Sequence, residues 1–214
     1  MSKNVMVIGT GTIGEPLIGL LAEHKEALGL EEILFFKRTP FSDEKGKVEA
    51  LLRKGAKIVS TSDVISDFKK LGFSDIEDVE KAYKDAGVII DCTPSGNENW
   101  ENIYSTLDQS KRFMAQGSEH GFGPFFAWGI NNDILLNDSN RYLIASCNTH
   151  NIASIVKTFA LDQSRELDEG QFVCLRRAND VSQNDSFSPS PTITKHSNQE
   201  FGTHHARDVH ELFA

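Results

Sequence analysis

The chain has 214 residues, of which 39% are hydrophobic and 25% charged, and its formal net charge is -9 at pH 7. That length fits one large α/β domain, or one domain and part of another. The acidic balance argues against a general surface for nucleic acid or anionic lipid, but it allows a local basic pocket for a phosphorylated ligand. Three scattered cysteines exclude a disulfide framework and no apolar run spans a bilayer, so we expect a cytoplasmic protein without nucleic-acid or membrane partners.

The first part of the chain alternates strands with helices. Residues 4–24, NVMVIGTGTIGEPLIGLLAEH, predict a buried strand, a tight glycine turn and an amphipathic helix. A second strand is expected at 31–38, a helix at 42–55 and a third strand at 56–61. This order is typical of βαβ units with a parallel sheet.

Residues 62–86 predict two short helices, and 87–94, GVIIDCTP, a buried strand that stops at the proline. Later apolar stretches predict strands at 111–117, 125–130 and 141–147. The fold class expected is α/β, a Rossmann-type doubly wound and mostly parallel sheet. We place this NAD(P)-binding domain at residues 1–146.

After residue 146 the pattern changes. A helix is expected at 148–163, a strand at 170–180 and a long polar loop at 181–201. One helix, one strand and a loop do not bury a core, so residues 147–214 predict only the N-terminal, incomplete part of an α+β catalytic domain.

Three glycines follow the first predicted strand in the pattern G-x-G-x-x-G. Gly9 permits the turn, Gly11 lets a pyrophosphate approach the backbone, and Gly14 lets the helix pack closely on the strand. The free N–H groups at the helix start would bind the pyrophosphate. We therefore predict a dinucleotide site, with a purely structural glycine turn as the alternative.

The residues that end the second predicted strand indicate which dinucleotide binds. An NAD site usually has an acidic residue there for the ribose 2′-hydroxyl, whereas this chain has Lys37, Arg38 and Thr39, and no acid before Asp43. Two cations and a hydroxyl suit a 2′-phosphate. NADP is the predicted cofactor and NAD remains possible; the alternative is a pair of solvated cations at a strand end.

Cys147 ends an apolar strand, directly before a predicted helix. A helix start lowers the pKa of a thiol, and a thiolate is a nucleophile able to attack an aldehyde carbon. Cysteine is also among the most frequently buried residues. Position alone therefore leaves both interpretations open, whereas Cys92 and Cys174 lie in apolar stretches and are expected to be inert.

Six short motifs, in this order and spacing, resemble archaeal-type glyceraldehyde-3-phosphate dehydrogenase over nearly the whole chain: GTGTIG, DCTPSG, AQGSE, SCNT, LRRAND and HHARDV. The resemblance implies a phosphorylating, homotetrameric enzyme of glycolysis and gluconeogenesis. Its partners would be a small phosphorylated aldehyde and inorganic phosphate. It also implies that Cys147 is the nucleophile, which forms a thiohemiacetal and then a thioester that phosphate releases as an acyl phosphate.

The resemblance also implies residues that contact the ligands. Near the cofactor it places Thr12, Ile13, Gly117 and Arg177. Near the substrate it places Ser146, Asn148, Thr149, His204 and His205. Arg176 and Arg207 are added as phosphate partners on their charge alone.

The seven histidines lack an accompanying cysteine pair or an H-E-x-x-H motif, so we predict no metal site. His150 departs from the SCNTT pattern usual in the family. The histidine that activates the cysteine in that family lies beyond this sequence, which predicts a truncated member with loss of catalysis as one expected outcome. Three other functions stay open: an aspartate-semialdehyde-type dehydrogenase, a non-catalytic NADP-binding or regulatory protein, and a subunit whose function lies in its contacts.

Overall fold

A computed structural model describes residues 2–117, 119–161, 167–174, 197–198 and 200–214 of the chain. These residues form two compact units, Met1–Ala115 (unit 1) and Gln116–Ala214 (unit 2). The domain boundary at residue 146, which we predicted from the change in sequence pattern, stays a prediction. Within the described residues, no helix combines the length and apolar character needed to cross a bilayer.

Unit 1 contains a sheet of six parallel strands in the order β4-β3-β2-β1-β5-β6. The strands are β1 Val5–Ile8, β2 Ile33–Phe36, β3 Lys57–Ser60, β4 Ile76–Asp78, β5 Val88–Asp91 and β6 Arg112–Gln116. The chain runs outward from β1 to β4 and then returns beside β1 as β5. The predicted α/β fold with a doubly wound parallel sheet is thus confirmed.

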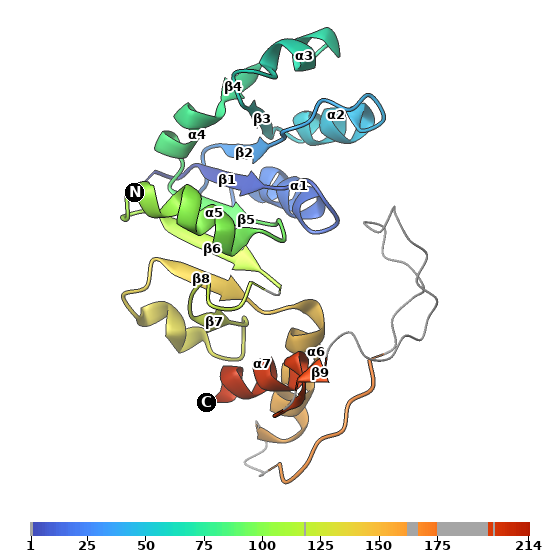
Figure 1. Ribbon diagram of the computed structural model, residues 1–214, viewed down its shortest axis with the longest axis vertical. Coiled ribbons are helices and arrows are strands. Elements are labelled where there is room, and N and C mark those ends of the chain that lie inside the picture. Colours follow the sequence, from blue (N-terminus) through green and yellow to red (C-terminus); the bar gives the residue numbers. More distant parts are fainter. Residues whose placement is uncertain (1, 118, 162–166, 175–196, 199) are drawn as a thin grey trace. The chain divides into compact units, whose positions relative to one another are not determined.

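Helices cover both faces of the unit 1 sheet, with α1 and α2 on one face and α4 and α5 on the other (Figure 1). They are α1 Gly14–His24, α2 Lys45–Arg53, α3 Ile65–Lys70, α4 Val79–Asp85 and α5 Gly96–Asn102, followed by the 3₁₀ turn η1 Tyr104–Thr106. A change of face is what right-handed crossovers require where the strand order reverses. The reversal between β1 and β5 is the switch point at which such sheets bind ligands.

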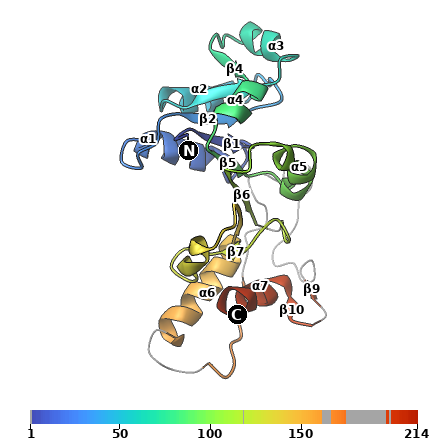
Figure 2. The same ribbon diagram turned by 90° about the vertical axis from the view of Figure 1, so that its left-hand side faces the viewer.

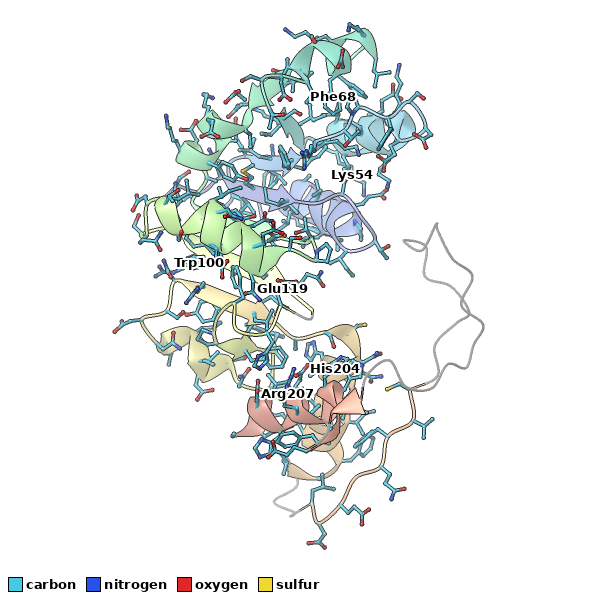
Figure 3. All side chains as sticks on the ribbon, in the orientation of Figure 1. Lys54, Phe68, Trp100, Glu119, His204 and Arg207 are labelled. Carbon is cyan, nitrogen blue, oxygen red and sulfur yellow. The ribbon has the colours of Figure 1, made fainter. Side chains whose placement is uncertain are left out.

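The core of unit 1 follows from the strand sequences. VMVI of β1 is buried along its whole length, as expected for a central strand that helices cover on both faces. On one face the apolar sides of α1 and α2 pack against Phe35 and Ile58. On α5, the ring of Trp100 meets Phe113 edge to face at 5.3 Å, and Figure 3 labels this tryptophan.

Unit 2 has fewer regular elements in its described residues. Strands β7 Phe125–Phe126 and β8 Arg141–Ile144 are parallel neighbours, and the 3₁₀ turn η2 Asn132–Leu136 joins them. Helix α6 Cys147–Phe159 follows β8, and β9 Ser197–Asn198 pairs with β10 Gly202–Thr203 ahead of α7 His204–Phe213. Helices α6 and α7 lie side by side (Figure 2).

Several elements differ from those predicted. Strand β4 interrupts the stretch expected to hold two helices, and α5 and α7 were not expected. The predicted strand at 170–180 has no strand in residues 170–174, and its remaining residues lie outside the described part. A strand of three residues is too short to show an alternating pattern in the sequence. The sequence therefore did not predict β4, which forms by parallel pairing with β3.

Candidate functional site

The glycine turn after β1 has the geometry that the G-x-G-x-x-G motif predicts. Gly9 has φ of +94°, a conformation that side chains other than glycine rarely adopt. A Cβ on Gly14 would lie 1.9 Å from the carbonyl oxygen of Gly9, whereas a Cβ on Gly11 would have no described atom beyond its chain neighbours within 4 Å. Gly9 and Gly14 therefore shape the turn, and Gly11 leaves open space beside it.

The middle of the turn is open to a ligand. Gly11, Thr12 and Ile13 are exposed, and in the described part of the chain no side chain caps the start of α1. Free N–H groups and the positive end of a helix dipole favour an anion. The residues present thus fit the pyrophosphate of a dinucleotide.

The cations that end β2 are in two different environments. Lys37 is 8% exposed, and its ammonium donates a hydrogen bond to the carboxylate of Glu44. Arg38 and Thr39 are exposed. Of the two cations predicted to bind a 2′-phosphate, Arg38 is open to solvent and Lys37 already has an anionic partner.

A buried carboxylate at the end of β5 organises the other side of the switch point. Asp91 is fully buried and accepts hydrogen bonds from the Thr93 hydroxyl (2.6 Å), the Asn99 amide (2.7 Å) and the Tyr104 hydroxyl (2.7 Å). The backbone N–H of Thr93 donates to it as well, at 2.8 Å. Asp91 was not among the predicted site residues, although the motif DCTPSG begins with it.

Cys147 is the first residue of α6 and it is exposed. Ser146 is the N-cap, and its hydroxyl accepts a hydrogen bond from the backbone N–H of Thr149 at 3.3 Å. The sequence left two environments open for this thiol, and the structure places it at a capped helix start within reach of solvent. Its role as a nucleophile stays a prediction.

The other two cysteines differ from Cys147. Cys92 is partly buried, and burial together with the nearby charge of Asp91 raises its pKa to about 12, so it is a neutral thiol at physiological pH. Cys174 is exposed in a segment without regular structure. Low reactivity at neutral pH is thus supported for Cys92, whereas the inertness of Cys174 stays a prediction.

His205 joins α7 to the first turn of α6. Its Nδ1 lies 3.3 Å from the hydroxyl of Thr149, and its Nε2 lies 3.4 Å from the amide nitrogen of Asn148. The tautomer of the imidazole decides which of these groups donates and which accepts. Thr149 is fully buried, and its hydroxyl also lies 2.9 Å from that of Ser146.

The structure therefore brings together four residues that the resemblance placed near the substrate: Ser146, Asn148, Thr149 and His205. The ring of His204 lies against that of His205, with centroids 3.9 Å apart. Figure 3 labels His204 on α7. The two histidines lie more than 50 residues from the other three in the sequence, and this assembly was expected only from the family pattern.

Asp208 completes a group that could hold a cation. The coordinating atoms of His204, His205 and Asp208 all lie within 4.8 Å of one another. Asp208 is buried, however, and the guanidinium of Arg207 donates to its Oδ1 at 2.6 and 3.0 Å. That pairing occupies one carboxylate oxygen and partly neutralises its charge, and our prediction of no metal site stays a prediction.

The remaining residues singled out in the sequence make other contacts or lie outside the described chain. Gly117 has φ of +76°, and its N–H donates to the carbonyl of Ile144 at 3.1 Å. Nε2 of His150 lies 3.0 Å from the backbone carbonyl oxygen of Trp128. Arg176 and Arg177 lie outside the described residues.

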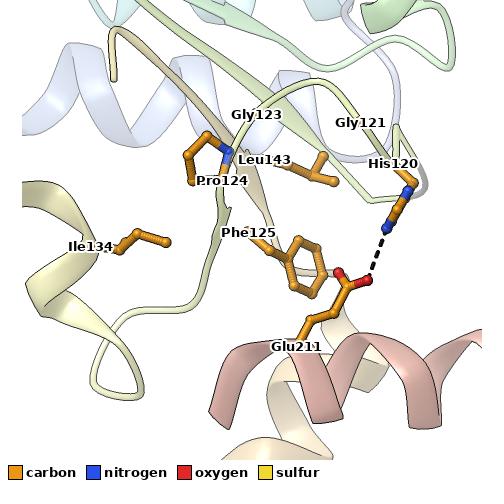
Figure 4. Close-up of a pocket in the computed structure, with 8 residues that line it drawn as sticks. All are labelled: His120, Gly121, Gly123, Pro124, Phe125, Ile134, Leu143 and Glu211. Carbon is orange, nitrogen blue, oxygen red and sulfur yellow. Dashed lines mark hydrogen bonds and ion pairs between the residues drawn. The ribbon is translucent and has the colours of Figure 1, made fainter. Parts of the chain in front are cut away.

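Unit 2 also contains a cavity of about 340 Å³ bounded by β7, β8 and α7 (Figure 4). Its lining includes the apolar side chains of Phe125, Ile134 and Leu143, and a contact of 3.1 Å between Nε2 of His120 and a carboxylate oxygen of Glu211. No predicted site residue lines this cavity.

Comparison with known proteins identifies relatives of one kind. The chain is 29% identical over 161 residues to the glyceraldehyde-3-phosphate dehydrogenase of Pyrobaculum calidifontis, which covers 74% of this chain and 44% of that protein. It is 27% identical over 209 residues to the enzyme of the same name from Sulfolobus acidocaldarius, covering 96% and 57%. A third protein of this name, from Pyrobaculum arsenaticum, is 30% identical to the chain over 161 residues. The match covers 74% of this chain and 44% of that protein.

The chain spans about half the length of the curated relatives it matches. No family model matches it. The resemblance predicted from the six motifs is confirmed: this chain is similar to archaeal proteins named glyceraldehyde-3-phosphate dehydrogenase.

Proposed function

We propose that this chain is the cofactor-binding and thiol-bearing part of a phosphorylating, NAD(P)-dependent glyceraldehyde-3-phosphate dehydrogenase. The observation that carries the proposal is the exposed thiol of Cys147 at a helix start that Ser146 caps, in the motif that the resemblance identified. The names of the relatives support a dehydrogenase reaction. The glycine turn of unit 1 supports the cofactor.

The cofactor would be held by the turn at Gly9, Gly11 and Gly14, with its pyrophosphate against the N–H groups at the start of α1. When bound, a nicotinamide cofactor supplies the acceptor for a hydride. The resemblance adds Thr12, Ile13, Gly117 and Arg177 to this site. NADP remains the proposed cofactor because Arg38 is an exposed cation at the end of β2, with NAD as a second possibility.

Cys147 would perform the covalent chemistry. Its thiolate attacks the aldehyde carbon, which forms a C–S bond and a thiohemiacetal. Loss of a hydride and of the hydroxyl proton oxidises that carbon by two electrons and leaves a thioester. Inorganic phosphate then attacks the thioester carbon, which breaks the C–S bond, releases the acyl phosphate and restores the thiolate.

The residues around the thiol would orient the substrate. The side-chain amide of Asn148 and the backbone N–H groups at the start of α6 are donors for the oxyanion that develops during attack. His204 and His205 would bind the substrate phosphate. Arg207 is a weaker candidate for this phosphate than its charge suggested, because its guanidinium already pairs with Asp208.

The test is labelling of the purified chain with iodoacetamide at several pH values from 5 to 8, followed by peptide mapping. We expect Cys147 to be labelled selectively and faster than the other cysteines, because it is exposed at the start of a helix, where N–H groups favour a negative charge. Cys174 is the matched control, since it is also exposed but outside a helix. Equal and slow labelling of both would contradict the proposal and favour a non-catalytic NADP-binding protein.

Turnover assays address the rest of the proposal. The chain is to be tested with glyceraldehyde 3-phosphate and with aspartate semialdehyde, in the presence of phosphate and NADP or NAD. We expect oxidation of the triose phosphate and loss of that activity in Cys147→Ser. Activity on the semialdehyde alone would replace the proposed substrate, and labelling without turnover would show that this chain by itself is inactive.

The proposal also includes the location and the oligomeric state of the active protein. We propose a cytoplasmic homotetramer, as the resemblance implies. Light scattering of the purified chain gives its mass, and a monomeric chain would confine that oligomeric state to longer members of the family.

A further inference from the structure

Next to the glycine turn, one carboxylate lies between two lysines. Glu44 directly precedes α2, and it accepts hydrogen bonds from the ammonium groups of Lys37 and, at 3.3 Å, of Lys47. Burial raises the pKa of the Glu44 carboxyl, but the hydrogen bonds and charges of the two lysines outweigh it and hold the pKa below its ordinary value. Glu44 is therefore an anion at neutral pH, and its side chain is 28% exposed.

Lys47 connects this pair to the predicted pyrophosphate site. Its ammonium lies 3.4 Å from the carbonyl oxygen of Thr10 in the glycine turn and 3.4 Å from the carboxylate of Glu15 in the first turn of α1. The end of β2, the start of α2 and the glycine turn are thus joined by one network of charged side chains. The network alternates in sign along Lys37, Glu44, Lys47 and Glu15.

This network changes the charge at the end of β2. The sequence has no acidic residue there, and the cations alone favour a 2′-phosphate. In the structure, the carboxylate of Glu44 reaches that position from the start of α2 and neutralises Lys37. A carboxylate at this place is what an NAD site uses to bind the ribose hydroxyl.

We propose that Glu44 is the residue that sets the choice between NADP and NAD, by holding Lys37 and Lys47 and by offering its own carboxylate to an unphosphorylated ribose. The inference rests on the proposed function, since it assumes that the glycine turn binds one of these dinucleotides. The protein is then a binder of both cofactors, and its preference for NADP is smaller than the cations alone predict.

The test measures binding rather than activity. Dissociation constants for NADP and NAD are determined by titration calorimetry for the unchanged protein and for Glu44→Gln. The substitution removes one negative charge beside two lysines, so we expect the ratio of Kd for NAD to Kd for NADP to rise about tenfold. The change should shrink at high salt, because it is electrostatic.

Two further variants make the result specific. Glu49→Gln, also on α2 and exposed in a pair with Lys45 at 3.8 Å, makes the same change in net charge outside the network, and the ratio is expected to stay within about twofold of the unchanged protein. Lys47→Gln leaves Glu44 with Lys37 alone, and the ratio should fall about tenfold. This second substitution tests the proposal even if Glu44→Gln fails to fold.

The outcomes separate this inference from the proposed function. If the unchanged protein binds neither cofactor, the proposed cofactor site is wrong and the inference falls with it. If both bind but neither substitution moves the ratio more than Glu49→Gln does, the cofactor site stands and the role of Glu44 is overturned. A ratio that moves in opposite directions in Glu44→Gln and Lys47→Gln supports the proposal.

Discussion

The two units of the chain hold their candidate sites by different means. In unit 1 the glycine turn and Asp91 follow directly from strands of the buried sheet, and β1 is buried along its length. In unit 2, Thr149 and Asn148, which follow Cys147, contact His205 through hydrogen bonds of 3.3 and 3.4 Å between segments more than 50 residues apart. The first site is thus part of a packed core, whereas the second depends on weaker polar contacts.

The exposure of apolar side chains shows the same difference. Among the described residues of unit 2, Trp128 is 69% exposed, Phe159 70% and Val173 85%. In unit 1 the most exposed large apolar side chain described is Leu28 at 58%, and the buried cluster that includes Phe35 and Ile58 lies there. Local opening costs least where few apolar contacts must be broken. We therefore expect the site of unit 2 to open at lower free energy than that of unit 1, and the following experiments test that comparison.

The largest effect is expected at the glycine turn. Gly14→Ala would place a Cβ 1.9 Å from the carbonyl oxygen of Gly9, so the turn and α1 must separate, and we expect a loss of about 3 kcal/mol or more in the free energy of unfolding. Urea denaturation measures it. Gly11→Ala is the control, since its Cβ enters open space; it should keep the stability within about 1 kcal/mol and weaken dinucleotide binding. Equal stability of the two variants would contradict the packing argument.

A smaller loss is expected from Asp91→Asn. The substitution replaces one acceptor oxygen by a donor NH₂ group in a buried site where Thr93, Asn99 and Tyr104 all donate. We expect a loss of roughly 2–4 kcal/mol in the free energy of unfolding. Tyr104→Phe removes one donor and leaves the carboxylate, so it should cost less than Asp91→Asn. The reverse order would show that Asp91 does not organise this network.

The sequence predicted most of unit 1 because its signals are local. The alternation of strands and helices, and the glycine spacing, are set by residues close together in the chain. The pairing of Lys37 with Glu44 could not be predicted in this way. Whether a lysine at the end of a strand is free or neutralised depends on how the following loop returns, and the sequence pattern does not specify that path.

Unit 2 was less predictable for the same reason. The helix at α6 and the cap at Ser146 follow from local pattern, but α7 was not expected, and the contact of His205 with Thr149 joins segments far apart in the sequence. Family resemblance placed these residues at one site. Physical reasoning from the sequence alone left the cysteine between two environments.

The stability of unit 1 is also expected to depend on alkaline pH. In unit 1, burial first and the charge of Asp91 second raise the pKa of both Cys92 and Tyr83 to about 12, from ordinary values of 9.0 and 10.0. The folded state therefore keeps protons that the unfolded chain loses. The resulting stability is complete below about pH 9 and is lost as the pH rises toward 12.

Urea denaturation at pH 8, 9.5 and 10.5 measures this loss. The signal is the fluorescence of Trp100 in a Trp128→Phe background, which reports on unit 1. We expect the free energy of unfolding to fall with each step, and Tyr83→Phe to make the decline shallower. A stability that is constant or rises over this range would show that these groups are not neutral in the folded state.

The smallest effect is expected at the contact between α6 and α7. Thr149→Val keeps the shape of a buried side chain but removes the hydroxyl that meets Ser146 and His205, so we expect a loss of about 1 kcal/mol. Thr149→Ser, which keeps the hydroxyl, is the control. Hydrogen exchange of α6 amides is the measurement, because local opening of this helix should increase without any change in β1.

This pair of variants also tests whether polar contacts hold the second site. If Thr149→Ser loosens α6 as much as Thr149→Val does, the methyl group and its packing stabilise the contact, and the distinction between the two units disappears. If only Thr149→Val does so, and iodoacetamide labelling of Cys147 changes with it, the hydroxyl positions the first turn of α6. The environment of the Cys147 thiol would then depend on His205, which lies 58 residues further along the chain.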